Sequence, residues 1–238
     1  MTGKPSRAAA SATQTQIRQV KRPRLDANGE VKPLMRGWIH TGTVPLALAA
    51  AIVLTALAPS VETKWASAIF MACSLLLFGV SAMYHRFSWR ERAFRFMRRW
   101  DHSNIYLLIA GTYTPISVGL LDGKERTTIL WIVWSGAILG VLITHLWIKA
   151  PRWLTSLIYI ILGWTAAWYL PALYHGGGAV PLVMMICGGA AYTVGGVIYA
   201  LKKPNPSPKY FGFHEIFHSC TVVGWTCLCI AAYFAVLG

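Results

Sequence analysis

The chain has 238 residues, of which 55% are hydrophobic and only 13% are charged. Soluble domains carry about a quarter charged residues, so this composition excludes an ordinary soluble domain. A mean hydropathy of +0.49 indicates a chain embedded in lipid, and the net charge of +14 raises the question of nucleic acid or anionic lipid as a partner.

The first segment of the chain, residues 1–36, differs in composition from the rest. It is polar, contains eight Lys and Arg residues, and has no apolar stripe at helical spacing. Low hydrophobicity combined with high net charge predicts a disordered basic tail. A signal peptide is not expected, because the first apolar stretch begins too far into the chain.

Seven apolar stretches follow, each long enough or nearly long enough to cross a hydrocarbon core of about 30 Å. The connections between them are short, which favours one compact bundle over several domains. Residues 37–238 are therefore predicted to form an all-α membrane domain, a bundle of seven transmembrane helices. The predicted spans are Trp38–Ala58, Trp65–Tyr84, Ser103–Leu121, Thr127–Ile148, Trp153–Leu173, Gly178–Leu201 and Phe211–Leu237.

Lys and Arg are distributed unevenly between the two sides of this predicted bundle. Nineteen of the 22 lie in the tail and in alternate connections, which include the loop 86–100, whereas the other connections contain only Lys64, Lys124 and Arg126. Because cytoplasmic segments carry the excess of basic residues, the N-terminus is predicted to be cytoplasmic and the C-terminus outside. The charge therefore indicates a multi-pass plasma-membrane protein with some attraction to anionic lipid, and no nucleic-acid partner is expected.

The last apolar stretch begins with the motif His214-Glu215-Ile216-Phe217-His218. Two histidines four residues apart lie on one face of a helix, where their imidazoles can bind a single metal ion. Zinc proteases with this motif take their third ligand from further along the chain, but residues 219–238 contain no His, Asp or Glu. The motif therefore predicts a metal site without predicting that kind of protease.

An intramembrane metalloprotease is a second interpretation, because such enzymes pair the same motif with a Leu-Asp-Gly sequence. The chain contains Leu121-Asp122-Gly123. Asp122, however, falls at the outer end of the third predicted span, about 30 Å from Asp101 at its start. The triplet is therefore interpreted as an outer turn.

The predicted topology places several polar residues at one depth. Ser81 and His85 end the second span, Asp101 begins the third, and His214 and His218 begin the last, all on the cytoplasmic side. Three neutral imidazoles around an open fourth position are typical of a catalytic zinc site. We therefore expect His85, His214 and His218 as Zn²⁺ ligands, Asp101 as the partner of the metal's water, and Ser81 as a supporting donor.

Other interpretations of these residues stay open at this point. Ser81 could bond to a carbonyl of its own helix, and Asp101 could be an N-cap or a partner of Arg98 or Arg99. His102 is an alternative ligand, although it projects about 100° away from Asp101. Three further histidines near predicted helix ends have either interfacial or functional interpretations: His40, His145 and His175.

The chain resembles the hemolysin III family, which is related to the progestin and adipoQ receptors. The resemblance covers roughly residues 36–237. It implies a seven-helix bundle with a zinc site in the cytoplasmic leaflet, held by His85, His214 and His218, with Asp101 at the metal's water and Ser81 nearby. The blocks that carry it are Ser81-Ala82-Met83-Tyr84-His85, Asp101-His102, Ala110-Gly111-Thr112-Tyr113-Thr114-Pro115 and His214-Glu215-Ile216-Phe217-His218.

The resemblance also implies a relation to membrane hydrolases that include ceramidases. The position of Glu215 need not be acidic in animal relatives, so Glu215 is not expected to be the general base. The leading functional hypothesis is a zinc-dependent hydrolase of a lipid amide or ester, with membrane lipids as substrates. The alternatives are a non-enzymatic regulator of membrane state with structural zinc and, less favoured because no ring of charges would line a pore, a cytolysin.

Overall fold

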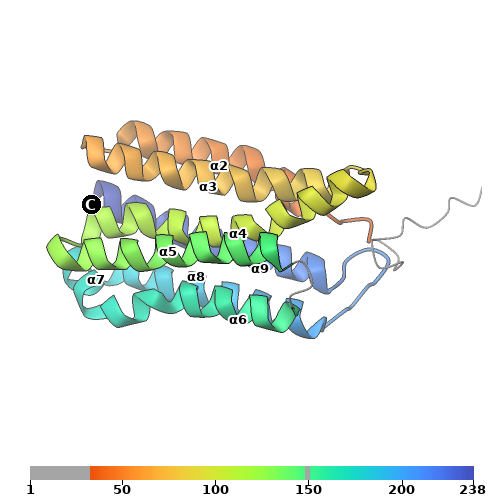
Figure 1. Ribbon diagram of the computed structural model, residues 1–238. Helices are drawn as coiled ribbons and strands as arrows, with labels where there is room; N and C mark the ends of the chain where they lie inside the picture. Colours follow the sequence, from red (N-terminus) through yellow and green to blue (C-terminus); the bar gives the residue numbers. More distant parts are fainter. Residues whose placement is uncertain (1–32, 148–150) are drawn as a thin grey trace, which may run out of the picture.

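The computed structural model describes residues 33–147 and 151–238, and all of the regular elements in these ranges are helical (Figure 1). The all-α prediction is therefore confirmed for this part of the chain. The predicted basic tail lies outside the described residues except for Pro33–Arg36. The elements are α2 (Trp38–Leu57), α3 (Val61–Arg86), α4 (Glu91–Leu120), α5 (Gly123–Leu146), α6 (Arg152–Gly163), η1 (Trp164–Tyr169), α7 (Leu170–Gly177), α8 (Ala179–Leu201) and α9 (Phe213–Leu237).

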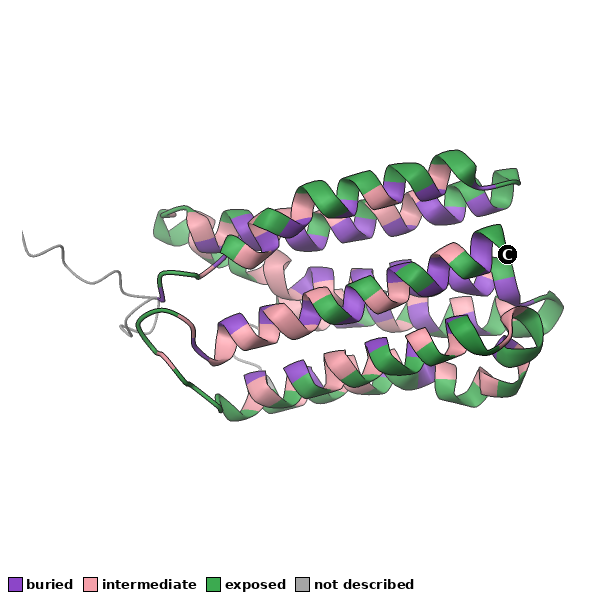
Figure 2. Ribbon diagram, turned by 180° about the vertical axis from the view of Figure 1, so that it is seen from behind, coloured by how far each residue is buried: buried purple, intermediate pink, exposed green. Residues whose placement is uncertain are grey.

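Six helical segments in the described ranges are long and apolar enough to cross a membrane. Their outward faces are largely exposed, as expected where lipid rather than protein surrounds the bundle (Figure 2). These segments agree with six of the seven predicted spans. The remaining one, the third predicted span, lies in α4. The six segments are Trp38–Leu57, Val61–Arg86, Gly123–Leu146, Trp153–Gly177, Ala179–Leu201 and Phe213–Leu237.

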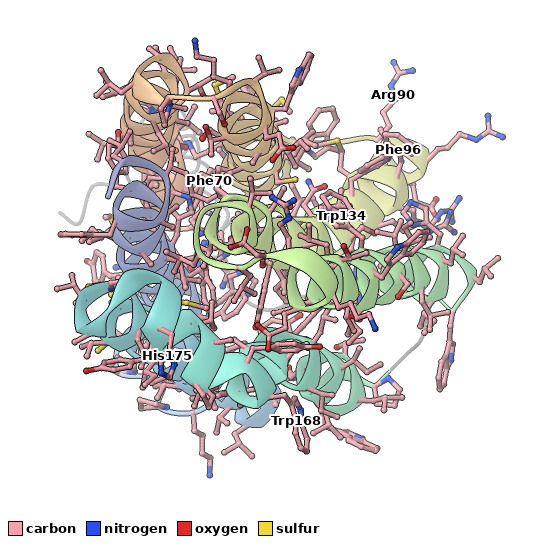
Figure 3. All side chains as sticks on the ribbon, turned by 90° about the vertical axis from the view of Figure 1, so that its left-hand side faces the viewer. Phe70, Arg90, Phe96, Trp134, Trp168 and His175 are labelled. Atoms are coloured by element: carbon pink, nitrogen blue, oxygen red, sulfur yellow. The ribbon has the colours of Figure 1, made fainter. Side chains whose placement is uncertain are left out.

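Helix α4 is less apolar because it lies at the centre of the bundle (Figure 3). It packs against α3, α5 and α9, and its buried residues include Asn104, Thr112 and Thr114. Thr112 and Thr114 donate hydrogen bonds to carbonyls one turn earlier, at 2.7 and 2.8 Å, and Asn104 donates to the Leu76 carbonyl of α3 at 2.9 Å. A helix surrounded by protein can carry such groups, because their partners are supplied within the bundle.

Helix α4 also begins earlier than predicted, at Glu91 instead of Ser103. Most of the predicted basic loop is thus helical, and an ion pair one turn apart, from Arg95 to Glu91 at 2.8 Å, supports this first part. Arg90 and Phe96 project away from the bundle here (Figure 3). Asp101 consequently lies inside a helix, which removes the N-cap interpretation.

The fifth predicted span is a helix broken into α6, η1 and α7. The hydroxyl of Tyr113 in α4 reaches this break: it donates to the Gly163 carbonyl at 2.7 Å and accepts from the Ala166 amide at 2.8 Å. Backbone groups released by a helix break at membrane depth need partners inside the protein. Tyr113 supplies them, so an irregular turn is tolerated where a continuous helix was predicted.

Candidate metal centre

Three histidines from two helices meet at the end of the bundle where α3 ends and α4 and α9 begin (Figure 1). His85 lies in the last turn of α3, and His214 and His218 lie in the first two turns of α9. One ring nitrogen of each falls within 4.8 Å of the other two. His85 and His218 are buried, and His214 is half-buried.

Within this group, Nε2 of His85 lies 3.2 Å from Nε2 of His214. Two nitrogens bound tetrahedrally to one ion at 2.0–2.1 Å would lie about 3.3 Å apart. The observed separation therefore fits a shared ion, and the donor set of three imidazoles suits a divalent transition metal. With all three ring nitrogens within 4.8 Å of one another, the histidine group could hold a metal ion.

A carboxylate and a hydroxyl lie beside this group. Oδ2 of Asp101 lies 3.8 Å from Nε2 of His85, and the buried Ser81 lies beside the same carboxyl group. Ser81, Asp101, His214 and His218 all line one cavity of about 40 Å³. The structure thus brings together all five residues that the sequence singled out, from three different helices.

His102 is not part of the histidine group, although it is close to Asp101. Its Nδ1 lies 3.7 Å from Oδ2 of Asp101 and 2.8 Å from the carbonyl oxygen of Arg98, and its Nε2 lies 3.2 Å from the hydroxyl of Tyr199. Tyr199 is buried and lines the same cavity. The sequence did not reveal this tyrosine, because it comes from α8, almost 100 residues further along.

Glu215, the acidic residue between the two α9 histidines, has both carboxylate oxygens engaged. Oε1 forms an ion pair with the guanidinium of Arg36, and Oε2 accepts the Gly212 amide at 2.8 Å. The segment around Arg36 also bonds to the α8–α9 connection, through the amides of Leu34 and Met35. These contacts hold the start of α9 and engage both oxygens of Glu215 within the protein.

The three remaining histidines lie in different surroundings in the fold. His145 lies 2.9 Å from the Val141 carbonyl, and His175 lies 2.7 Å from the Pro171 carbonyl, each with its own helix. His40 instead is 3% exposed, and its ring stacks on that of His218 with centroids 3.9 Å apart. A histidine near a helix start has no sequence feature that distinguishes this buried position from an interfacial one.

Asp122 lies at the opposite end of the bundle from the histidine group, as the N-cap residue of α5. Almost 20 residues of continuous α4 separate it from Asp101. The triplet therefore lies at the short α4–α5 connection, away from the histidine group; its predicted location on the outer side stays a prediction.

A larger apolar cavity of about 100 Å³ lies beside the polar one, between α4, α6, α8 and α9. Leu77, Ile105 and Phe217 line both cavities. Trp164 and Ile186, which are exposed on the outer surface of the bundle, line the apolar cavity as well. The polar cavity at the histidines therefore borders an apolar cavity that reaches toward the lipid-facing surface.

Comparison with known proteins identifies the family of this chain. The Haemolysin-III related family matches residues 29–229. Hemolysin-3 homolog of Bacillus subtilis is 32% identical over 201 residues, covering 83% of this chain and 89% of that protein. Hemolysin-3 of Bacillus cereus is 36% identical over 103 residues, covering 43% of this chain and 47% of that protein.

A human relative, monocyte to macrophage differentiation factor, is 24% identical over 185 residues, with 74% of this chain and 76% of that protein covered. The match to the family spans α2 to most of α9 and therefore includes every residue of the histidine group. With six apolar helices of membrane-spanning length, this match identifies a multi-pass protein of the cell membrane. The chain belongs to the Haemolysin-III related family.

Proposed function

We propose that this protein is a zinc-dependent membrane hydrolase that cleaves a lipid amide or ester at the cytoplasmic leaflet. One observation carries the proposal: three imidazoles within 4.8 Å of one another border a carboxylate, Asp101, in a cavity that adjoins an apolar one. A metal site, a proton acceptor and an apolar space are the parts that hydrolysis of a lipid linkage requires.

In this proposal His85, His214 and His218 hold the ion, and neutral imidazoles suit zinc. Bound zinc supplies a Lewis acid and lowers the pKa of water toward about 7. Asp101 accepts a proton at Oδ2 and later returns it to the leaving group. Ser81, beside the same carboxyl group, holds Asp101 in place through its hydroxyl.

The lipid would enter from the side of the bundle. Its acyl chain would occupy the apolar cavity, past Leu77, Ile105 and Phe217, and its amide or ester would lie at the polar cavity. Removal of acyl surface from water would not drive this step, since the chain passes from lipid to protein. Shape and the polar groups at the end of the cavity would therefore select the substrate.

The proposed topology has α4 as a seventh span and the N-terminus in the cytoplasm. The central position of α4 and its 30-residue length support a crossing, because 20 residues suffice for the hydrocarbon core. The basic residues of the first part of α4 and of the α8–α9 connection lie at the same end as the histidines. That end faces the cytoplasm under the positive-inside rule.

Purified protein tested on a panel of amide and ester lipids would test the proposal. Wild type should release fatty acid, and Asp101→Ala should abolish release while retaining its metal. If no lipid in the panel is cleaved and Asp101→Ala keeps the cellular phenotype of wild type, catalysis is excluded. A non-enzymatic regulator with structural zinc is then the better description, and His85→Ala should chiefly lower its thermal stability.

A further inference from the structure

His40 lies in the metal centre without having been assigned a part in it. It comes from the first turn of α2, is 3% exposed, and lines the same cavity as His214 and His218. Its ring is stacked on the ring of His218, with centroids 3.9 Å apart and an interplanar angle of 15°. The ring of Phe78 packs against that of His40 in an edge-to-face arrangement, with centroids 5.1 Å apart.

The stacked geometry is incompatible with His40 as a fourth ligand of the same ion. A metal lies in the plane of the imidazole that binds it, at about 2.0–2.1 Å from the nitrogen. The two rings are nearly parallel and 3.9 Å apart, so an ion in the plane of His218 lies well outside the plane of His40. The histidine group that could hold an ion accordingly consists of His85, His214 and His218.

His218 differs from an ordinary ligand histidine in how its ring is held. Ligand histidines usually form a hydrogen bond from the second ring nitrogen to a carboxylate, a carbonyl or water, which fixes the ring's orientation. Nδ1 of His218 has no hydrogen-bonding partner among the described residues. The flat contact with His40 is therefore the restraint on the face of the His218 ring.

The two helices that carry the stacked rings also contact each other elsewhere. Helix α2 packs against α9, and the hydroxyl of Tyr233 in α9 donates to the Ala50 carbonyl of α2 at 2.5 Å. The edge-to-face contact with Phe78 of α3 also limits movement of the His40 ring. A ring fixed in this way can hold the neighbouring ring at one rotation about its Cβ–Cγ bond.

We infer that His40 is a positioning residue of the metal centre, which fixes the orientation of His218 by ring stacking and so increases metal affinity. The inference rests on the metal site of the proposed function and is independent of catalysis. Partners that orient a ligand typically contribute about 10–100-fold to metal affinity. Loss of the stacked ring should therefore weaken metal binding by that factor.

Three variants separate the ring from its nitrogens. His40→Ala removes both, His40→Phe keeps a flat ring without nitrogens, and His40→Gln keeps a polar nitrogen without the ring. Zn²⁺ affinity of the full-length protein, measured by competition with a chromophoric chelator, should fall by about 10–100-fold for Ala and Gln. The Zn²⁺ affinity of His40→Phe should stay within about threefold of that of wild type. His175→Ala, at an exposed histidine away from the metal centre, is the matched control.

The absorption spectrum of the Co²⁺-loaded protein provides a readout that general destabilisation would not change. Ala and Gln should alter the ligand-field bands, because His218 rotates, whereas Phe should preserve them. Unchanged affinity and spectrum in His40→Ala would overturn the inference. It would also be overturned if His40→Phe lost metal affinity while His40→Gln retained it. If wild-type protein bound no metal, both this inference and the proposed zinc site would be overturned. If the variants showed the expected affinities but the protein cleaved no lipid, only the proposal of catalysis would be overturned.

Discussion

Arg36 and Glu215 form a buried ion pair across 179 residues of sequence, joining the segment before α2 to the first turn of α9. The Glu215 side chain is fully buried and that of Arg36 is 12% exposed. The second oxygen of the carboxylate accepts the amide of Gly212. The pair therefore holds the helix that carries His214 and His218 against the chain that leads into α2.

Breaking this pair should destabilise the protein while sparing its metal ligands. Glu215→Gln leaves a buried guanidinium without its counter-charge, which typically costs about 3–5 kcal/mol. We expect a clearly lower thermal unfolding midpoint in detergent and a metal content close to that of wild type. Glu91→Gln is the matched control, because its pair with Arg95 is exposed and should contribute less than about 1 kcal/mol.

The double variant Arg36→Leu with Glu215→Leu should recover much of this stability, because removal of both charges leaves neither unpaired. An unchanged unfolding midpoint in Glu215→Gln, together with loss of hydrolysis, would instead assign Glu215 a chemical role.

Removal of a metal ligand should abolish metal binding. His85→Ala and His214→Ala each leave two imidazoles, so bound zinc per chain should fall from near one in wild type to near zero. Elemental analysis of the purified proteins checks this result, with His145→Ala as the control outside the histidine group. A wild-type stoichiometry near zero would contradict the metal site itself.

Asp101 and Ser81 should affect turnover to different degrees. Asp101→Asn removes the proposed proton acceptor beside His85 and should lower the rate of fatty-acid release by about 10²–10⁴-fold. Ser81→Ala removes a neutral hydroxyl, worth about 0.5–1.5 kcal/mol, and should lower it by roughly ten-fold or less. Both variants should retain zinc, and equal rates for Asp101→Asn and wild type would exclude Asp101 from the reaction.

Gly37 should be intolerant of a side chain. Its φ of +84° favours glycine, and a Cβ there would lie 2.8 Å from Cβ of His85. We expect Gly37→Ala to cost at least about 1–2 kcal/mol and to weaken metal binding by displacing His85. Gly42→Ala, where a Cβ would meet nothing within 4 Å, should instead be neutral or slightly stabilising. Thermal unfolding and zinc affinity of the two variants provide the comparison.

The hydroxyl of Tyr113 should be important for the broken fifth span. Tyr113→Phe leaves the Gly163 carbonyl and the Ala166 amide without their partner, at a cost of about 1–3 kcal/mol. Faster hydrogen exchange in residues 163–169 would locate the effect. Tyr174→Phe, at an exposed tyrosine of α7, should leave exchange there unchanged. The same exchange rates in both variants would show that Tyr113 does not hold the break.

The amino-acid sequence by itself determined the membrane setting, the all-α class and the convergence of Ser81, His85, Asp101, His214 and His218 at one end. These properties depend on the lengths of apolar runs and on helical spacing, which are local along the chain. The early start of α4 was missed because its charged first turns resemble a loop, and the break in α6 depends on Tyr113, 50 residues away.

Only the tertiary structure decided which of the remaining polar residues lie at the histidine group. His40 stacks on His218 and Arg36 pairs with Glu215, each across almost 180 residues. A ring nitrogen of His102 contacts the hydroxyl of Tyr199 in α8. Such contacts depend on how α2, α4, α8 and α9 pack and rotate against one another. Periodicity within one helix identifies the face on which a residue lies, but it cannot identify the residue that packs against that face.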